Sequence, residues 1–120
     1  MTSVSTLTIL APDLLAARKF YCDMLGFAVA ADYGPDLTKL QNDGCALLLA
    51  RCAQVARPDY PAAAQFALGL AVADAGAELK RLKAAGVELI FDEPQDFPAG
   101  RFIAVRDPAG NVVELLQFNP

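Results

Sequence analysis

The closing stretch of the chain reads Arg101-Phe-Ile-Ala-Val-Arg-Asp-Pro-Ala-Gly-Asn-Val-Val-Glu-Leu-Leu-Gln-Phe-Asn-Pro120. Two apolar, β-branched runs, at residues 102–105 and 112–118, flank a segment in which proline presets φ, glycine permits a positive φ and Asp107 can bond the turn backbone. This pattern predicts a β-hairpin. Its second strand carries one carboxylate, Glu114, which is costly to bury unless it is paired, ligated or beside a water-filled pocket.

Glu114 has two alternative roles in such a strand. Side chains alternate across a strand, so Glu114 shares a face with Val112 and Leu116, while both of its direct neighbours are apolar. Neither face is polar, which disfavours a charge that simply points to solvent. The carboxylate is therefore either paired with an arginine, such as Arg101 or Arg106, or it faces a pocket. In a pocket it would be a metal ligand or an acceptor for a ligand's N–H group or cation. We favour the pocket.

The hairpin ends a pattern that occurs twice along the chain. Each copy has a strand, a helix with an aspartate N-cap and a glycine after its last turn, and then further strands. One helix is expected between Asp13 and Gly26, and the other between Asp74 and Gly86. The aspartates are 61 positions apart and the glycines 60, which indicates an internal repeat. The other expected strands lie at residues 4–10, 27–33, 37–41, 45–51, 66–72 and 87–91.

Helices packed on one face of mostly antiparallel strands predict an α+β protein. We expect one domain over residues 1–120, with repeat one at about 1–53, a proline-containing linker at about 54–64 and repeat two at about 65–120. Residues 94–100, with two prolines and a glycine, are expected to form an irregular rim or lid.

Composition excludes several classes of function. The chain has no histidine, which removes the commonest metal ligand and general base. Its net charge is −4 and its ten basic residues are spread thinly, so we expect no nucleic-acid partner. We expect no signal peptide, and no apolar run is long enough to span a bilayer. We therefore expect a cytoplasmic protein without a membrane partner. Cys22, Cys45 and Cys52 are then most simply reduced, buried thiols.

Aromatic side chains offer a second kind of site. Most of them are expected in the core, but rings on strands and loops can also stack on a planar ligand. Tyr33 and Tyr60 lie beside breaks in regular structure, which favours a place at a pocket rim. Phe102, in the first strand of the hairpin, is the strand aromatic expected to line the pocket.

Three segments resemble signatures of the glyoxalase / bleomycin-resistance / extradiol dioxygenase (vicinal oxygen chelate) superfamily. They are Asp13-Leu-Leu-Ala-Ala-Arg-Lys-Phe-Tyr-Cys-Asp-Met-Leu-Gly-Phe27, Leu79-Lys-Arg-Leu-Lys-Ala-Ala-Gly-Val87 and Asp107-Pro-Ala-Gly-Asn-Val-Val-Glu114. The resemblance implies two βαβββ repeats that form a curved, mostly antiparallel sheet around a cleft, usually in a homodimer. In the metal-dependent members, a divalent ion sits in the cleft, held by a His or Gln in the first strand and a Glu in the last strand of each half.

Carried onto this chain, those four positions fall at Thr6, Leu48, Ala67 and Glu114. Only Glu114 matches, and one carboxylate does not hold Mn²⁺, Fe²⁺ or Zn²⁺, which need several oxygen or nitrogen ligands. No metal or other cofactor is therefore expected. The resemblance then points to the metal-free branch, which includes proteins that sequester antibiotics such as bleomycin and mitomycin.

These observations favour a metal-free homodimer that binds a small, partly aromatic or cationic molecule. The alternatives are a glyoxalase-type lyase or isomerase, with Glu114 as base, and a subunit without a small ligand. The expected ligand-binding residues are Thr6, Thr8, Tyr33, Leu48, Tyr60, Ala67, Phe102 and Glu114.

Overall fold

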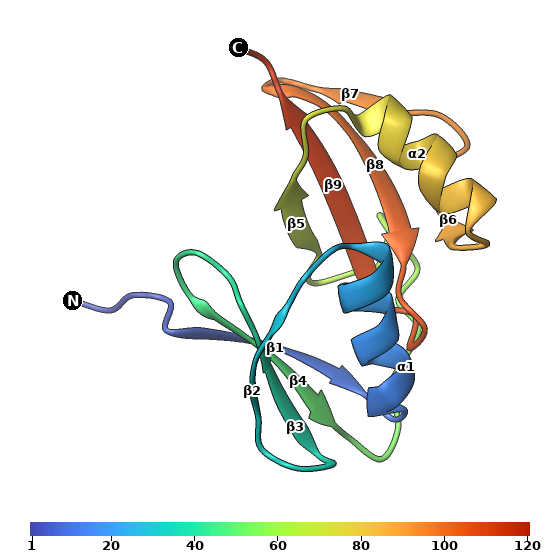
Figure 1. The fold of residues 1–120 in the computed structure, drawn as a ribbon. Coiled ribbons are helices and arrows are strands. Elements are labelled where there is room, and N and C mark those ends of the chain that lie inside the picture. The colour runs from blue at the N-terminus through green and yellow to red at the C-terminus, as the bar shows by residue number, and fades with distance from the viewer. The chain divides into compact units, whose positions relative to one another are not determined.

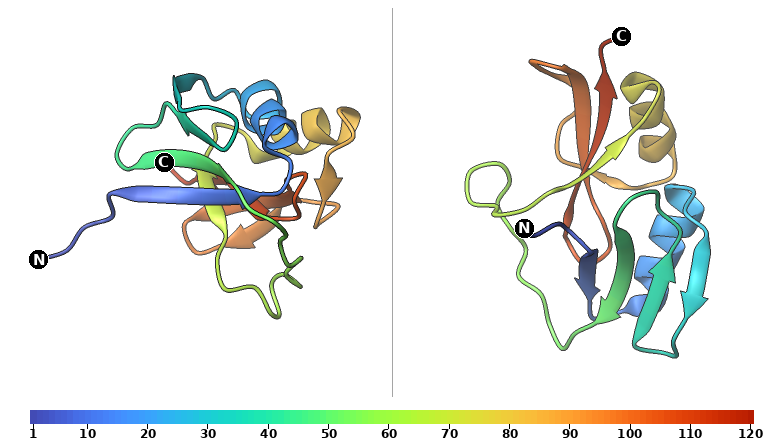
Figure 2. Two further views of the ribbon diagram at one scale, coloured as in Figure 1. Left: turned by 90° about the horizontal axis from the view of Figure 1, so that it is seen from below. Right: turned by 90° about the vertical axis from the view of Figure 1, so that its left-hand side faces the viewer.

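The computed structural model describes residues 1–120 and divides them into two compact units, Met1–Ala56 and Arg57–Pro120 (Figure 1). Each unit contains a βαβββ repeat, to which the second unit adds one strand, and each has one mixed sheet with one face covered by helix (Figure 2). The α+β class and the repeat are therefore confirmed. That the repeats together form one domain stays a prediction.

The first unit has a four-stranded sheet in the order β1-β4-β3-β2. Strands β1 and β4 run parallel, and the other neighbours run antiparallel. Its elements are β1 (Thr6–Ala11), α1 (Leu14–Lys19), the π-helix η1 (Phe20–Met24), β2 (Val29–Asp32), β3 (Leu37–Leu40) and β4 (Ala46–Arg51).

The second unit repeats this topology in the order β5-β9-β8-β6, with β5 and β9 parallel and an extra strand, β7, paired with β8. Its elements are β5 (Leu68–Ala71), α2 (Ala75–Ala84), β6 (Glu88–Leu89), β7 (Gln95–Phe97), β8 (Gly100–Arg106) and β9 (Val112–Phe118).

Both helices begin and end as their sequences predict. The Asp13 carboxylate accepts from the Ala16 backbone N–H at 3.1 Å, and that of Asp74 accepts from Ala77 at 3.0 Å. Each therefore satisfies one of the backbone donors left free at a helix start. Gly26 and Gly86 follow the helices with φ of 81° and 80°, a conformation that side chains with a Cβ rarely adopt.

The first helix differs from the expected single α-helix. After Lys19 it continues as a π-helix, in which the Leu25 N–H bonds the Phe20 carbonyl at 3.2 Å. The wider turn lets two consecutive rings, Phe20 and Tyr21, both enter the core, with their centroids 5.1 Å apart.

The segment at residues 94–100 is also more regular than expected. Residues Gln95–Phe97 form β7, and Asp96 pairs with Arg101 across a tight antiparallel turn. The prediction of irregular structure is therefore wrong, because the two prolines stand just outside the paired residues and remove no ladder hydrogen bond. That the segment forms a rim or lid stays a prediction. The three cysteines are free and half-buried, not fully buried as expected.

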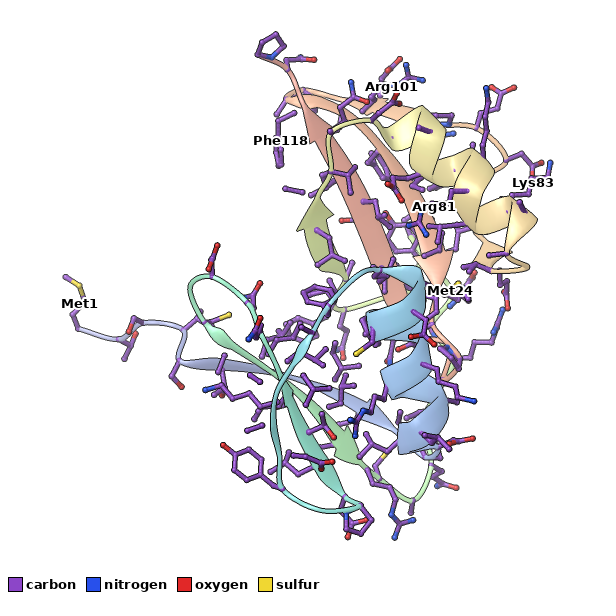
Figure 3. All side chains as sticks on the ribbon, in the orientation of Figure 1. Met1, Met24, Arg81, Lys83, Arg101 and Phe118 are labelled. Carbon is purple, nitrogen blue, oxygen red and sulfur yellow. The ribbon has the colours of Figure 1, made fainter.

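The core of the second unit lies between α2 and its sheet. Val113 and Leu115 of β9 and Ile103 and Val105 of β8 are each at most 2% exposed. Alternation puts all four on one face, and α2 packs against β8 and β9 from that side. The opposite face of the sheet carries no helix of this unit, and Figure 3 places Phe118 there, on the side of β9 away from α2. None of the helices is both long and apolar enough to span a bilayer.

Candidate functional site

Glu114 lies in the middle of β9, on the helix-free face of the second sheet. It pairs with Gly69 of β5 on one side and with Ala104 of β8 on the other. Paired residues on adjacent strands point to the same face, so the carboxylate stands between two very small residues. A Cβ on Gly69 would lie only 3.1 Å from the end of the Leu116 side chain. The small neighbours therefore give Glu114 and Leu116 their space.

Tyr60 is the hydrogen-bond partner of Glu114. The tyrosine lies in a turn that is closed by the Ala63 N–H bonding the Asp59 carbonyl at 2.6 Å. From this turn its hydroxyl donates to Oε2 of Glu114, and both side chains are partly buried. Burial raises the pKa of Tyr60 well above its usual value of 10.0, and the Glu114 hydrogen bond and charge raise it further. Tyr60 therefore stays a neutral donor at physiological pH.

Five aromatic rings, beginning with that of Tyr60, contact one another in sequence along the helix-free side of the unit. Successive ring centroids are 6.2, 6.1, 5.8 and 5.9 Å apart, each pair meeting edge to face. In contact order these rings, which we call the aromatic row, are Tyr60, Phe91, Phe102, Phe97 and Phe118. Phe118 at its far end is 53% exposed. The row places apolar, partly accessible ring surface next to a carboxylate.

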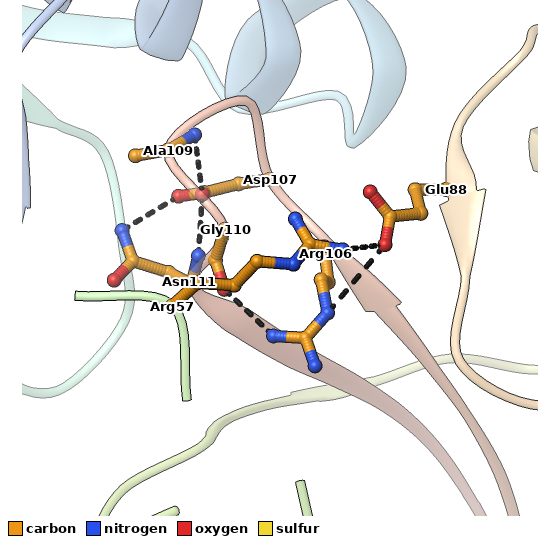
Figure 4. Close-up of polar contacts among 7 residues, drawn as sticks. All are labelled: Arg57, Glu88, Arg106, Asp107, Ala109, Gly110 and Asn111. Atoms are coloured by element: carbon orange, nitrogen blue, oxygen red, sulfur yellow. Dashed lines mark hydrogen bonds and ion pairs between the residues drawn. The ribbon is translucent and has the colours of Figure 1, made fainter. Parts of the chain in front are cut away.

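An ionic cluster lies at the hairpin end of the same sheet (Figure 4). The Arg57 guanidinium bonds Oε2 of Glu88, and Nε of Arg106 lies 3.6 Å from the same oxygen. Arg106 also donates to the Gly110 carbonyl at 3.1 Å. We call Arg57, Glu88 and Arg106 the Arg–Glu–Arg cluster.

The hairpin turn itself is held by Asp107, which is 4% exposed. Its Oδ1 accepts the backbone N–H groups of Ala109 and Asn111 at 3.0 and 2.8 Å, and its Oδ2 accepts the Asn111 amide at 2.9 Å. Asp107 thus has the turn-bonding role that the sequence predicts.

The structure brings together Tyr60, Phe102 and Glu114 within the second unit. Ala67, by contrast, is exposed and precedes β5, and the residue that pairs with Glu114 is Gly69, two positions later. Glu114 accepts from Tyr60 and Arg106 forms an ion pair with Glu88, so pairing of Glu114 with Arg106 does not hold.

The other four expected residues belong to the first unit. Thr8 pairs with Leu48 and Thr6 with Ala46, so Thr6, Thr8 and Leu48 share one face of the first sheet. Tyr33 follows β2 and is 61% exposed.

A divalent metal ion does not fit these residues. In the second sheet, the positions on either side of Glu114 are Gly69 and Ala104, whose side chains carry no donor. In the first sheet, Leu48 offers nothing and Thr8 at most a hydroxyl. No three side chains of His, Cys, Asp or Glu gather into a cluster. The donor set thus falls short of what such an ion requires.

Sequence reasoning missed Gly69, Phe91 and Phe97. The repeat spacing of 61 equates Gly69 with Thr8, and that correspondence could have identified it as the neighbour of Glu114. The sequence around Phe91 and Phe97 does not indicate a site. Both rings reach Phe102 only through the folding of the segments on either side of Pro94.

Comparisons with known proteins place this geometry in a family. The model of the Glyoxalase/Bleomycin resistance protein/Dioxygenase superfamily matches residues 3–115. A search of curated proteins finds no match.

Solved structures share the fold over nearly the whole chain. Lactoylglutathione lyase from Agrobacterium tumefaciens is 24% identical with a TM-score of 0.73, over 96% of this chain and 92% of that one. TnmS3, an antibiotic binding protein from Streptomyces sp. CB03234, is 26% identical with a TM-score of 0.72, over 99% and 98%. A possible glyoxalase from Bacillus cereus is 23% identical with a TM-score of 0.75, over 97% and 99%. The chain belongs to the Glyoxalase/Bleomycin resistance protein/Dioxygenase superfamily.

Proposed function

We propose that this protein binds a small planar molecule, aromatic and preferably cationic, without a metal, as in antibiotic or aromatic-metabolite sequestration. The observation that carries the proposal is the Glu114 carboxylate beside the aromatic row, with a neutral tyrosine as its hydrogen-bond partner.

Charge favours a cationic ligand. Because Tyr60 donates a hydrogen bond but no positive charge, the Tyr60–Glu114 pair keeps the negative charge of the carboxylate. Oε1 of Glu114 is free to accept a hydrogen bond from an N–H group of the ligand. A charge-assisted bond of this kind is stronger than a neutral one.

Ring surface favours a planar ligand. Aromatic faces attract both flat rings and cations, and the rings of the row meet edge to face, so part of each face is turned away from its neighbour. The likeness to an antibiotic binding protein supports an antibiotic as one kind of ligand.

Calorimetric titration with two flat probes of similar size tests the proposal. Aminoacridine is a planar cation at neutral pH, and anthraquinone sulfonate is a planar anion. We expect saturable binding of the cation and weaker or no binding of the anion. The proposal fails if neither aminoacridine nor any planar cation in a broader antibiotic panel binds or raises the melting temperature.

Glu114→Gln provides the matched variant. It keeps the shape of the side chain but removes the charge, so we expect aminoacridine affinity to fall about tenfold or more, as for loss of a charge-assisted hydrogen bond. Glu93→Gln makes the same change at an exposed loop position and should leave the affinity unchanged. Equal affinities of the two variants would contradict the role given to Glu114.

A lyase or isomerase in which Glu114 takes a proton is the alternative. The Tyr60 hydroxyl already occupies Oε2, so such a base would have to act through Oε1. Glyoxalase-type turnover that Glu114→Gln abolishes, or stoichiometric metal after extensive dialysis, would favour this alternative over sequestration.

Homodimeric assembly and a cytoplasmic location are further parts of the proposal, taken from the family resemblance and the sequence. Sedimentation equilibrium across a concentration series tests the dimer, and fractionation of cells that produce the protein tests the location.

A further inference from the structure

Arg57 lies three positions before Tyr60 and is fixed at the hairpin end of the second sheet. Its guanidinium bonds Glu88 of β6, and its Cγ lies 3.4 Å from the point that a Cβ on Gly110 would occupy. The side chain therefore rests over the turn between β8 and β9 while its charged end reaches β6 (Figure 4).

The strands that contact Arg57 are held together by their own pairing and side-chain contacts. Glu88 and Arg106 are direct partners across β6 and β8. The Arg106 side chain is only 10% exposed and is tied to the Gly110 carbonyl. Glu88 thus presents its carboxylate to Arg57 from a strand pair that is already held in place.

The cluster and the Tyr60–Glu114 contact lie on the same face of the sheet. Arg106 precedes the hairpin turn and Ala104, the partner of Glu114, lies two residues before it on β8, so their side chains point the same way. Three residues of chain span at most about 11 Å. Anchoring Arg57 therefore restricts the turn that carries Tyr60 to the neighbourhood of Glu114.

We propose that the Arg–Glu–Arg cluster positions the Tyr60 hydroxyl on Glu114 and so shapes the ligand site, although none of its three side chains belongs to that site. The effect on ligand binding rests on the proposed function, whereas the effect on Tyr60 does not. Arg57 and Glu88 are both more than half exposed, and exposed ion pairs add little to global stability. The Arg57–Glu88 ion pair therefore determines the position of the turn that carries Tyr60, and contributes little to the stability of the fold.

The test measures the titration of Tyr60 in the ligand-free protein by NMR of ¹³Cζ-labelled tyrosine. Tyr60→Phe assigns the signal among the three tyrosines. In the unmodified protein we expect the pKa of Tyr60 to lie well above 10. Glu88→Gln and, independently, Arg57→Met should lower the pKa of Tyr60 toward its ordinary value, because the phenol loses first its burial and second its contact with Glu114, which together raise that pKa. Arg57→Lys should retain part of the shift.

Arg81→Met is the matched control. It removes an arginine that bonds Glu78 on the surface of α2, at 2.5 Å in the same unit. We expect no change in the Tyr60 titration. If Glu88→Gln and Arg57→Met also leave the titration unchanged, or if Arg81→Met moves it as much, the positioning role is overturned.

Aminoacridine titrations of the same variants separate this inference from the proposed function. If the unmodified protein binds the probe, Glu88→Gln and Arg57→Met should weaken binding by roughly 2- to 30-fold, the range typical of substitutions that act through a neighbouring element. A shifted Tyr60 titration with unchanged affinity would overturn the link to the ligand site. A shifted titration with no binding in any variant would support the positioning and reject the proposed function.

Discussion

Tyr60→Phe is expected to destabilise the protein at neutral pH and to lose that effect in alkali. The substitution removes the hydroxyl that donates to Glu114 but keeps the ring that contacts Phe91. A hydrogen bond to a charged group contributes about 1.5–3 kcal/mol, and the partial exposure of this pair favours the lower end. We therefore expect the free energy of unfolding to fall by about 1.5 kcal/mol near pH 7.

The pH dependence follows from the raised pKa of Tyr60. In the unfolded chain the phenol titrates near 10, whereas in the folded protein burial, first, and Glu114, second, hold its proton to higher pH. Above pH 10 the unfolded state thus binds fewer protons than the folded state, and unfolding becomes easier as pH rises. The stabilisation from the raised pKa is complete below pH 10 and is lost above it.

The size of this loss is set by proton linkage. Between about pH 9 and about pH 11, release of one proton from the unfolded chain alone lowers the free energy of unfolding by about 1.4 kcal/mol. Tyr60→Phe has no proton to release, so the difference between the two proteins should shrink from about 1.5 kcal/mol to about zero over this range.

Urea denaturation followed by far-ultraviolet circular dichroism measures the difference at each pH. Tyr33→Phe is the control, because it removes a phenol that is 61% exposed and makes no recorded side-chain hydrogen bond. A difference between the unmodified protein and Tyr60→Phe that stays constant from about pH 8 to about pH 11 would refute the assignment of the alkaline loss to Tyr60.

Three further predictions concern stability and use urea denaturation near pH 7. Asp107→Ala should lower the free energy of unfolding by about 2–4 kcal/mol, because it leaves turn donors without their acceptor; a loss below about 0.5 kcal/mol, the usual size for a surface substitution, would contradict this. Leu82→Ala, at a fully buried position of α2, should cost about 2–5 kcal/mol, and a variant as stable as the parent would show that the site repacks without a cavity. Asp74→Ala should cost about 0.5–2 kcal/mol through loss of the N-cap, and Asp74→Asn should restore most of it.

The sequence predicted well those features that depend on neighbouring residues. Asp13 and Asp74 cap their helices, and Asp107 bonds its own turn, as their local patterns indicate. The strand–helix–strand–strand–strand order along each half was also predicted, apart from the additional strand β7 in the second half. These features are set within a few residues, where propensity and hydrogen bonding decide the outcome.

Contacts between distant residues were not predictable in the same way. Tyr60 and Glu114 are 54 positions apart, and Arg57 and Glu88 are 31 apart. The sequence placed Tyr60 at a rim and Glu114 in a pocket without indicating that they bond each other. Register has the same limitation, since the choice between Ala67 and Gly69 beside Glu114 depends on a two-residue shift that leaves the strand pattern unchanged.

The two repeats share a topology but not a chemistry. At the equivalent position of the last strand, the first repeat has Leu48 beside Thr8, and the second has Glu114 beside Gly69. A leucine there needs no partner, whereas a carboxylate on a partly buried sheet face needs a donor. The second unit supplies that donor from outside its βαβββ elements, through Tyr60 in the segment that precedes β5. The second unit thus combines a carboxylate with a segment that supplies its donor, and the proposed ligand site depends on this pair.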